Sequence, residues 1–175
     1  MLSEILKKED CAACRFCCAF RRQSLWETPI FTLENTESIE ADQKLEASVL
    51  QKFSFENNTY ARYDLSNNYK TDDSEEEAPC PYLSKNGCIL DANEKPWDCK
   101  IWPLRVMRKT DGALVIALTP TCPSVNKIDI EKVREFVNEK LADSLFEYVK
   151  DHSFLIKQYH EGFPILVEKI NRLYI

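Results

Sequence analysis

Residues 11–18 read Cys11-Ala12-Ala13-Cys14-Arg15-Phe16-Cys17-Cys18 and place four cysteines within eight residues. The other four cysteines of the chain form a looser series, at Cys80, Cys88, Cys99 and Cys122. A Cys-x-x-Cys step allows two thiolate sulfurs to reach one metal ion or cluster without straining the backbone, and such soft ligands select zinc and iron–sulfur clusters. The pattern therefore predicts a metal centre, with all eight cysteines as candidate ligands.

The spacing within the dense segment favours an iron–sulfur cluster over zinc. Cys11, Cys14 and Cys17 make two consecutive Cys-x-x-Cys steps. They suit three corners of a [4Fe–4S] cubane whose fourth ligand comes from elsewhere in the chain. A structural zinc more often uses two Cys-x-x-Cys pairs from separate loops, and the second half of this chain has none. Zinc stays the alternative occupant. The eight thiolates also fit either two sites of four ligands or one site with four spare cysteines, because spacing alone does not assign thiolates to metals.

The first ten residues carry acidic side chains and no apolar core, so they do not predict a secretory signal. We therefore expect a cytoplasmic protein, in which thiols stay reduced. The alternative, four disulfides in an exported protein, is disfavoured further by the adjacent Cys17 and Cys18, which rarely pair with each other. Thiol–disulfide exchange at this pair stays open if one of the two thiols is not a ligand.

Composition excludes several other classes of protein. The 175 residues carry a net charge of -6, which argues against general nucleic-acid binding. Three glycines leave no phosphate-binding glycine loop. The longest apolar run, residues 113–118, is far shorter than the roughly 20 residues of a membrane helix, so we expect no membrane span.

Hydrophobic spacing predicts an α+β fold centred on the metal, with two β-hairpins and a C-terminal helical region. Alternation predicts hairpins over residues 52–65 and 104–118, the second turning at Asp111-Gly112. Spacings of three and four predict helices from Ile128 onward, the first capped by Asp129. Further helices are expected over residues 2–8 (capped by Ser3), 32–50, 154–159 and 165–173, with a polar loop over 66–78. We thus expect a cysteine-cluster domain over residues 1–127 and a helical region packed on it over 128–175.

Several ordered motifs resemble one known family of proteins. After the dense cluster come Cys80-Pro81-Tyr82-Leu83, then Gly87-Cys88-Ile89-Leu90, then Lys95-Pro96-x-x-Cys99-x-x-x-Pro103. Together they resemble the bacterial CxxCxxCC family, described as a zinc- or iron-chelating domain, over about residues 8–125. Lys95 and Lys100 stand where the family usually has arginine, and Leu90 replaces an aromatic residue. No thiolate is lost by these departures.

The resemblance implies a cytoplasmic metal-binding domain. Flagellin lysine-N-methylases resemble the same cysteine pattern, use S-adenosylmethionine and are thought to carry an iron–sulfur cluster. The resemblance thus implies methyl transfer to a protein or peptide lysine as one activity, with S-adenosylmethionine as cofactor. The alternative is a zinc-stabilised interaction module without catalysis. No catalytic or methyl-donor-binding residue is assigned by the sequence.

Other side chains are candidates for supporting the metal centre. Two groups of cations are candidates for balancing thiolate charge. Three arginines lie near the first motif, at Arg15, Arg21 and Arg22, and four cations follow Cys99, at Lys100, Arg105, Arg108 and Lys109. Four aromatic residues are candidates for shielding the site from water, or for core positions: Phe16, Phe20, Trp97 and Trp102. His152 and His160 are candidate extra ligands, although isolated histidines more often serve ordinary surface or core roles.

Overall fold

The computed structural model describes residues 4–21, 28–42, 45–63 and 77–169. Helices and strands are both present, and the α+β class predicted from the sequence is confirmed. The chain divides into two compact units. Unit 1 comprises Met1–Lys7 with Ile101–Ile175, and unit 2 comprises Lys8–Lys100. The division falls between Lys100 and Ile101, inside the Lys95–Pro103 motif, and residue 127, the expected boundary, belongs to unit 1.

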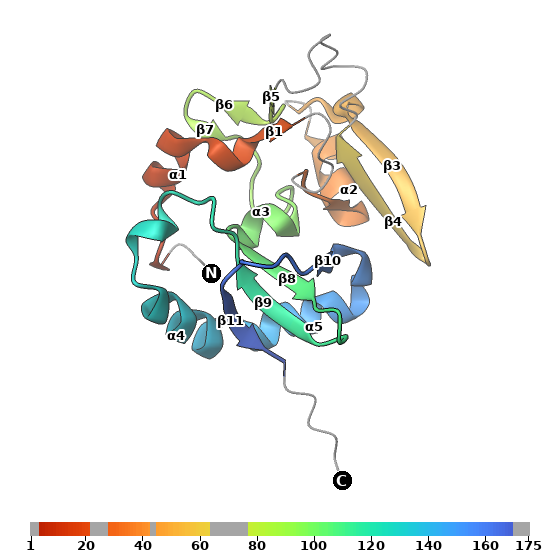
Figure 1. Cartoon of the computed structure of the whole chain (residues 1–175). Helices are drawn as coiled ribbons and strands as arrows, with labels where there is room; N and C mark the ends of the chain where they lie inside the picture. Colours follow the sequence, from red (N-terminus) through yellow and green to blue (C-terminus); the bar gives the residue numbers. More distant parts are fainter. Residues whose placement is uncertain (1–3, 22–27, 43–44, 64–76, 170–175) are drawn as a thin grey trace. The chain divides into compact units, whose positions relative to one another are not determined.

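Unit 2 contains short helices and three small sheets (Figure 1). Its strands pair as β2-β4-β3, β1-β5 and β6-β7, and every pair is antiparallel. In chain order, its elements are α1 (Lys8–Cys14), η2 (Phe16–Cys18), β1 (Ala19–Arg21), β2 (Phe31–Thr32), α2 (Leu33–Ala41), η3 (Ala47–Val49), β3 (Leu50–Phe55), β4 (Asn58–Tyr63), β5 (Glu77–Pro79), β6 (Leu83–Ser84), β7 (Gly87–Cys88) and α3 (Trp97–Ile101), whose last residue belongs to unit 1.

Aromatic side chains form the core of unit 2. Phe20 of β1, Phe31 of β2 and Tyr63 of β4 are buried together with Tyr82, which lies in the turn before β6. Cys80 and Cys88 pack against this cluster. Burial of such rings is the main stabilising term for a small unit of this kind. The core therefore extends directly to two of the candidate ligands.

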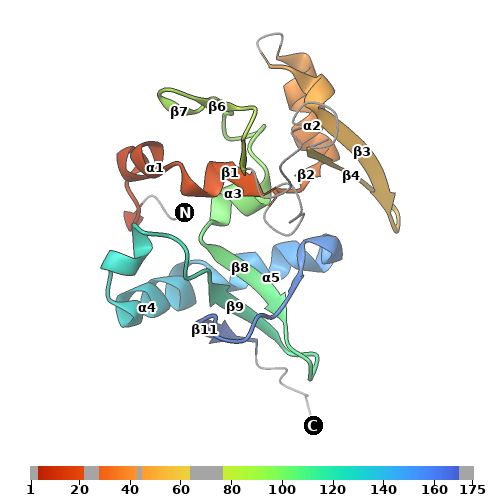
Figure 2. The ribbon, with the colours of Figure 1, turned by 45° about the horizontal axis from the view of Figure 1, so that its top comes forward.

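Unit 1 is built on a four-stranded sheet in the order β10-β8-β9-β11 (Figures 1 and 2). Only β10 and β8 run parallel, and the other pairs are antiparallel. Helices α4 and α5 bury an apolar face, as the spacing predicted, and the Asp129 carboxylate accepts a hydrogen bond from the Glu131 amide at 2.9 Å. The elements are β8 (Leu104–Arg108), β9 (Leu114–Leu118), η4 (Val125–Lys127), α4 (Ile130–Lys140), α5 (Ala142–Asp151), η5 (Ser153–Leu155), β10 (Lys157–Gln158) and β11 (Ile165–Glu168).

Both predicted hairpins are confirmed, as β3–β4 and β8–β9. The helices predicted from Ile128 onward are confirmed as α4 and α5, but those predicted over 154–159 and 165–173 are wrong at residues 157–158 and 165–168. Residues 157–158 and 165–168 are strands. The first pairs with β8 and the second with β9, so both satisfy backbone groups that would otherwise lie at the edges of the β8–β9 hairpin. A short apolar run such as Ile165-Leu166-Val167 suits a strand as well as a helix, so the pattern alone was ambiguous.

Three further boundaries differ from the prediction. The helix expected over 32–50 ends at Ala41. The alternating residues from Leu50 onward form β3, which pairs with β4. Most of the polar loop expected over 66–78 lies outside the described residues, and residues 77–79 form β5 against β1. The first α-helix begins at Lys8 and includes Cys11 and Cys14, whereas it was expected over 2–8; Ser3, its proposed cap, lies outside the described residues. In the part of the chain that the structure describes, no helix is both long and apolar enough to cross a lipid bilayer.

Candidate metal centre

The dense cysteine segment folds as a helix followed by a sharp reversal. Helix α1 ends at Cys14, and Arg15 then adopts a left-handed conformation with φ 55°. The Cys18 amide donates to the Arg15 carbonyl at 3.0 Å, which closes the turn. A non-glycine residue in this conformation is uncommon and costs about 1–2 kcal/mol. The reversal lets Cys17 and Cys18 turn back toward the rest of unit 2.

The first motif is held against the Cys80–Cys88 hairpin by backbone contacts. The Cys80 amide donates to the Cys18 carbonyl at 2.7 Å, and β1 pairs with β5 from this point. On the other side of the segment, the Arg15 guanidinium donates to the Lys85 carbonyl at 2.7 Å in the β6–β7 turn. These two hydrogen bonds join residues that are 62 and 70 positions apart in the sequence.

Gly87 brings the hairpin close to α1. It has φ 99°, and a Cβ atom at this position would lie 3.3 Å from the Cβ of Ala12. Only glycine allows both this backbone conformation and this approach without strain. The structure therefore explains a glycine directly before Cys88, and Figure 2 shows α1 beside the β6–β7 hairpin.

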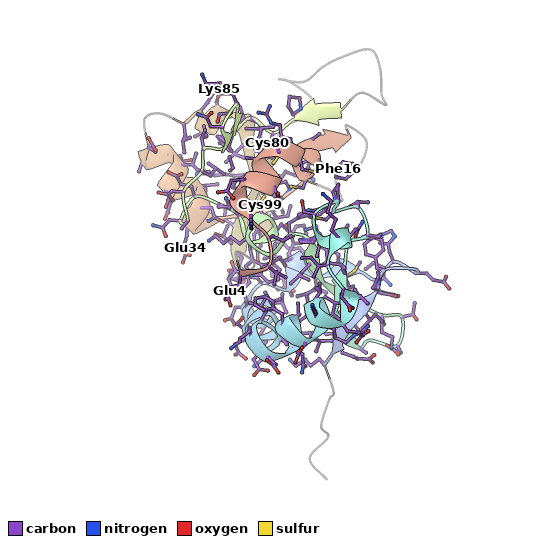
Figure 3. All side chains as sticks on the ribbon, turned by 90° about the vertical axis from the view of Figure 1, so that its left-hand side faces the viewer. Glu4, Phe16, Glu34, Cys80, Lys85 and Cys99 are labelled. Carbon is purple, nitrogen blue, oxygen red and sulfur yellow. The ribbon has the colours of Figure 1, made fainter. Side chains whose placement is uncertain are left out.

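Cys99 comes from a third segment, which is anchored to the β2–α2 region. Its amide donates to the Pro96 carbonyl at 3.1 Å at the start of α3. The neighbouring Asp98 carboxylate accepts from the Ile30 amide at 3.2 Å, and the Asn35 side-chain amide donates to the Asn93 carbonyl at 2.6 Å. Figure 3 marks Cys99 and Cys80 within unit 2.

Four cysteines from these three segments lie close enough for their charges to interact. The pKa of Cys99 is well above its usual range, first because of burial and then because of the charges of Cys80, Asp98, Cys18 and Cys88. Burial also raises the pKa of Cys80, to about 11, and the charges of Cys18 and Cys88 add to this effect. We call Cys18, Cys80, Cys88 and Cys99 the thiol cluster.

Cys99 retains exposed surface although burial raises its pKa. Protein atoms surround the thiol at longer range and raise its pKa, while its own surface stays accessible.

Cys18 has a lowered pKa, in contrast to Cys80 and Cys99. A hydrogen bond with the Cys17 thiol lowers the pKa of Cys18 to about 7, burial opposes this shift, and the positive charge of Lys95 contributes to it. Cys17 therefore lies beside the cluster and acts on one of its members. Lys95 is a cation near the thiols, and in the sequence it stands where the family usually has arginine.

The Cys80 sulfur has two hydrogen-bond partners. The Tyr63 hydroxyl lies 3.1 Å from the Cys80 Sγ, and the Tyr82 backbone amide also donates to this atom. Both hydrogen bonds lower the pKa of Cys80 against the larger effect of burial. Burial likewise raises the pKa of Tyr63 well above its usual range, and the charges of Cys80 and Cys99 add to the shift. Sequence reasoning missed Tyr63, since nothing in the alternation of β4 relates it to a cysteine.

The remaining predicted ligands lie in different places. Cys11 is in α1, and its side chain lies outside the described residues; Cys14 is exposed at the end of the same helix. Cys122 is buried in unit 1, where its carbonyl accepts from the Asn126 amide at 3.1 Å. No disulfide joins the seven cysteines whose side chains are described. Within the described ranges, no three Cys, His, Asp or Glu side chains are arranged as ligands of one ion, so the thiol cluster is a neighbourhood of thiols and not an assembled coordination sphere.

Several auxiliary predictions can be placed. Phe20 and Trp97 are buried in unit 2, whereas Phe16 is 51% exposed and does not shield the site by itself (Figure 3). The Arg15 guanidinium binds backbone carbonyls. Residues of unit 1 have partners there: Arg105 lies over the Trp102 ring, His152 contacts Tyr148 and His160 stacks on Phe163.

The donor chemistry of the thiol cluster fits a metal that prefers sulfur. It combines four thiols, two hydrogen-bond donors on one sulfur and a nearby lysine, all on one unit. In comparisons with known proteins, no family model matches the chain, and neither a curated protein nor a solved structure matches it.

Proposed function

We propose that unit 2 binds a metal centre through cysteine thiolates, with the thiol cluster as its principal ligands. The observation that carries the proposal is that three cysteine-bearing segments pack together. The Cys80 amide donates to the Cys18 carbonyl at 2.7 Å, Cys80 and Cys88 pack on the same aromatic cluster, and Cys99 lies within electrostatic range of all three. Burial and the like charges of neighbouring thiolates oppose ionisation at Cys80 and Cys99. A bound metal cation removes this cost, because it stabilises deprotonated sulfur ligands.

An iron–sulfur cluster is the leading occupant. Hydrogen bonds to a sulfur ligand, of the kind seen at Cys80, are one of the protein's means of setting a cluster's potential. Cys11, Cys14 and Cys17, whose spacing suits a [4Fe–4S] cluster, share one segment with Cys18 and are available as further ligands. Zinc is the alternative, since four thiolates also form a closed tetrahedral structural site. When bound, an iron–sulfur cluster supplies one-electron redox chemistry, whereas zinc supplies folding energy.

The other cysteines are secondary candidates. Cys11, Cys14 and Cys17 share the α1–η2 segment with Cys18, so they are available to replace one ligand or to form a second site. Cys122 belongs to unit 1 and stays a predicted ligand. Substitution of each by serine, with metal content as the readout, assigns them to the centre or removes them from it.

Serine variants of the thiol cluster test the proposal directly. Cys88→Ser keeps the size of the side chain but removes a soft ligand, and we expect the purified protein to lose most of its metal. Ser84→Ala is the matched control: it alters the same hairpin, where the Ser84 hydroxyl donates to the Gly87 carbonyl at 2.8 Å, without touching a thiol. Equal metal content in wild type and Cys88→Ser protein would reject Cys88 as a ligand.

Methyl transfer to a protein or peptide lysine stays a prediction from the family resemblance alone. Titration of the metal-loaded protein with S-adenosylmethionine tests it. Saturable binding supports an enzyme, whereas no binding together with unfolding on metal removal supports a zinc-stabilised interaction module.

A further inference from the structure

Tyr63 presents its hydroxyl to one sulfur of the thiol cluster. Its Oη lies 3.1 Å from the Cys80 Sγ, well within the distance of a hydrogen bond to sulfur. The side chain is 3% exposed, and its ring centroid is 5.3 Å from those of both Phe20 and Phe31. Because the ring is packed on these sides, the hydroxyl has little freedom to turn away from Cys80.

The direction of this hydrogen bond follows from the chemistry of a metal ligand. A metal-bound cysteine is a thiolate and has no proton to donate, whereas a tyrosine hydroxyl is protonated at neutral pH. Tyr63 must therefore donate to Cys80 when a metal is bound. The Tyr82 backbone amide supplies a second donor to the same sulfur, so Cys80 is held from two directions.

We propose that Tyr63 is a positioning residue of the metal centre, which orients the Cys80 thiolate and withdraws electron density from its sulfur. This inference rests on the proposed function. Partners that hydrogen-bond a ligand fix its orientation, and their loss typically costs about 10–100-fold in metal affinity. A hydrogen bond to a cluster sulfur also stabilises the reduced, more negative state, which raises the reduction potential.

A purely structural role for Tyr63 makes a different prediction. A buried hydroxyl needs a partner, so its contact with Cys80 could serve folding alone. In that case, its removal would lower stability but would leave the affinity and the spectrum of a bound metal unchanged. The test therefore needs a readout on the metal itself.

Tyr63→Phe removes the donor and keeps the ring, and Tyr82→Phe is the matched control. Tyr82 is equally buried and its ring lies 6.1 Å from that of Tyr63, but its hydroxyl donates to the Glu46 carbonyl at 3.0 Å. Tyr82→Phe also preserves the backbone amide that donates to Cys80. Circular dichroism and a thermal melt of each metal-free variant check that both fold.

Metal affinity is measured by competition with a chelator, using whichever metal the wild type binds. We expect Tyr63→Phe to bind it about 10–100-fold more weakly than wild type and Tyr82→Phe to match wild type. For an iron–sulfur cluster, the midpoint potential of Tyr63→Phe falls. For zinc, cobalt(II) serves as the probe, and its sulfur-to-metal charge-transfer absorption shifts in Tyr63→Phe only.

Two results would overturn the inference in distinguishable ways. Metal-loaded Tyr63→Phe protein with the affinity and the potential or absorption of wild type rejects the role of Tyr63 and leaves the proposed function standing. Wild-type protein that binds neither iron–sulfur nor zinc rejects both. A measurement without any variant adds a check: if exchange of metal-loaded wild type into D₂O leaves the metal–sulfur Raman bands unmoved, no hydrogen bond reaches the sulfurs.

Discussion

At the scale of single residues, the thiols of unit 2 are not equivalent. The pKa of Cys18 is lowered to about 7, and the pKa of Cys80 is raised to about 11. The cause is local: Cys18 has a hydrogen bond with the Cys17 thiol and a nearby lysine, while burial dominates at Cys80. The adjacent Cys17 is visible in the sequence, but the burial of Cys80 and the approach of Lys95 to Cys18 come from tertiary structure.

This difference predicts the order in which the thiols of metal-free protein react. A thiol is unreactive below its pKa and reactive above it. Alkylation of Cys18 by iodoacetamide should therefore reach half its maximal rate near pH 7, and that of Cys80 near pH 11. Mass spectrometry of timed digests measures both profiles in one sample. Coincident profiles for the two residues would contradict the described surroundings.

Variants of Cys17 isolate the cause of the lowered pKa. Cys17→Ala removes the hydrogen bond to Cys18, so we expect the alkylation profile of Cys18 to move upward toward the ordinary thiol value of 9.0. Cys17→Ser keeps a donor at the same position and should leave the profile close to that of wild type. An unmoved profile in Cys17→Ala would show that the hydrogen bond is not the main cause.

At the scale of elements, the β6–β7 hairpin and α1 bring the two cysteine motifs together. Gly87→Ala introduces strain at φ 99° of about 1–3 kcal/mol and a contact of 3.3 Å with the Ala12 Cβ. Gly112→Ala is the control, because Gly112 has a similar φ of 88° with open space around it. Denaturant unfolding should show a larger loss for Gly87→Ala than for Gly112→Ala. Equal losses would mean that the approach of α1 to the hairpin adds nothing.

The elements also show how far the sequence could be read. The β8–β9 hairpin was predictable because Asp111-Gly112 marks its turn and the flanking residues alternate. Residues 165–168 were not, since their pairing with β9 depends on a sheet edge that the sequence does not show. The same limit applies to the site: the cysteines were evident from spacing, but Tyr63 reaches Cys80 only through the packing of β4.

At the scale of the whole molecule, the two units depend differently on a metal. Unit 1 has an apolar sheet of its own, with Leu104, Val106, Met107, Val115 and Ile116 buried. Unit 2 has a smaller aromatic core against which Cys80 and Cys88 pack. Binding energy at a thiolate site is folding energy for the segment that carries the ligands.

Metal removal should therefore unfold the molecule unevenly. After treatment with a chelator, we expect hydrogen exchange to rise throughout α1, β1 and β5–β7, while β8, β9 and β11 remain protected. Exchange measured by mass spectrometry at peptide resolution gives this map. Uniform exchange across both units would indicate that the metal does not stabilise unit 2 selectively.

The central claim is that the chain holds a thiolate-bound metal, and its composition tests this most directly. The protein is purified without oxygen, and iron, zinc and acid-labile sulfide are measured together with an absorption spectrum, in wild type and Cys88→Ser. We predict about four iron and four sulfide per chain with a broad band near ~400 nm in wild type, largely lost in Cys88→Ser. Zinc alone, about one per chain, would move the proposal to a structural site. Wild-type protein with neither metal, after expression with both supplied, would contradict the account.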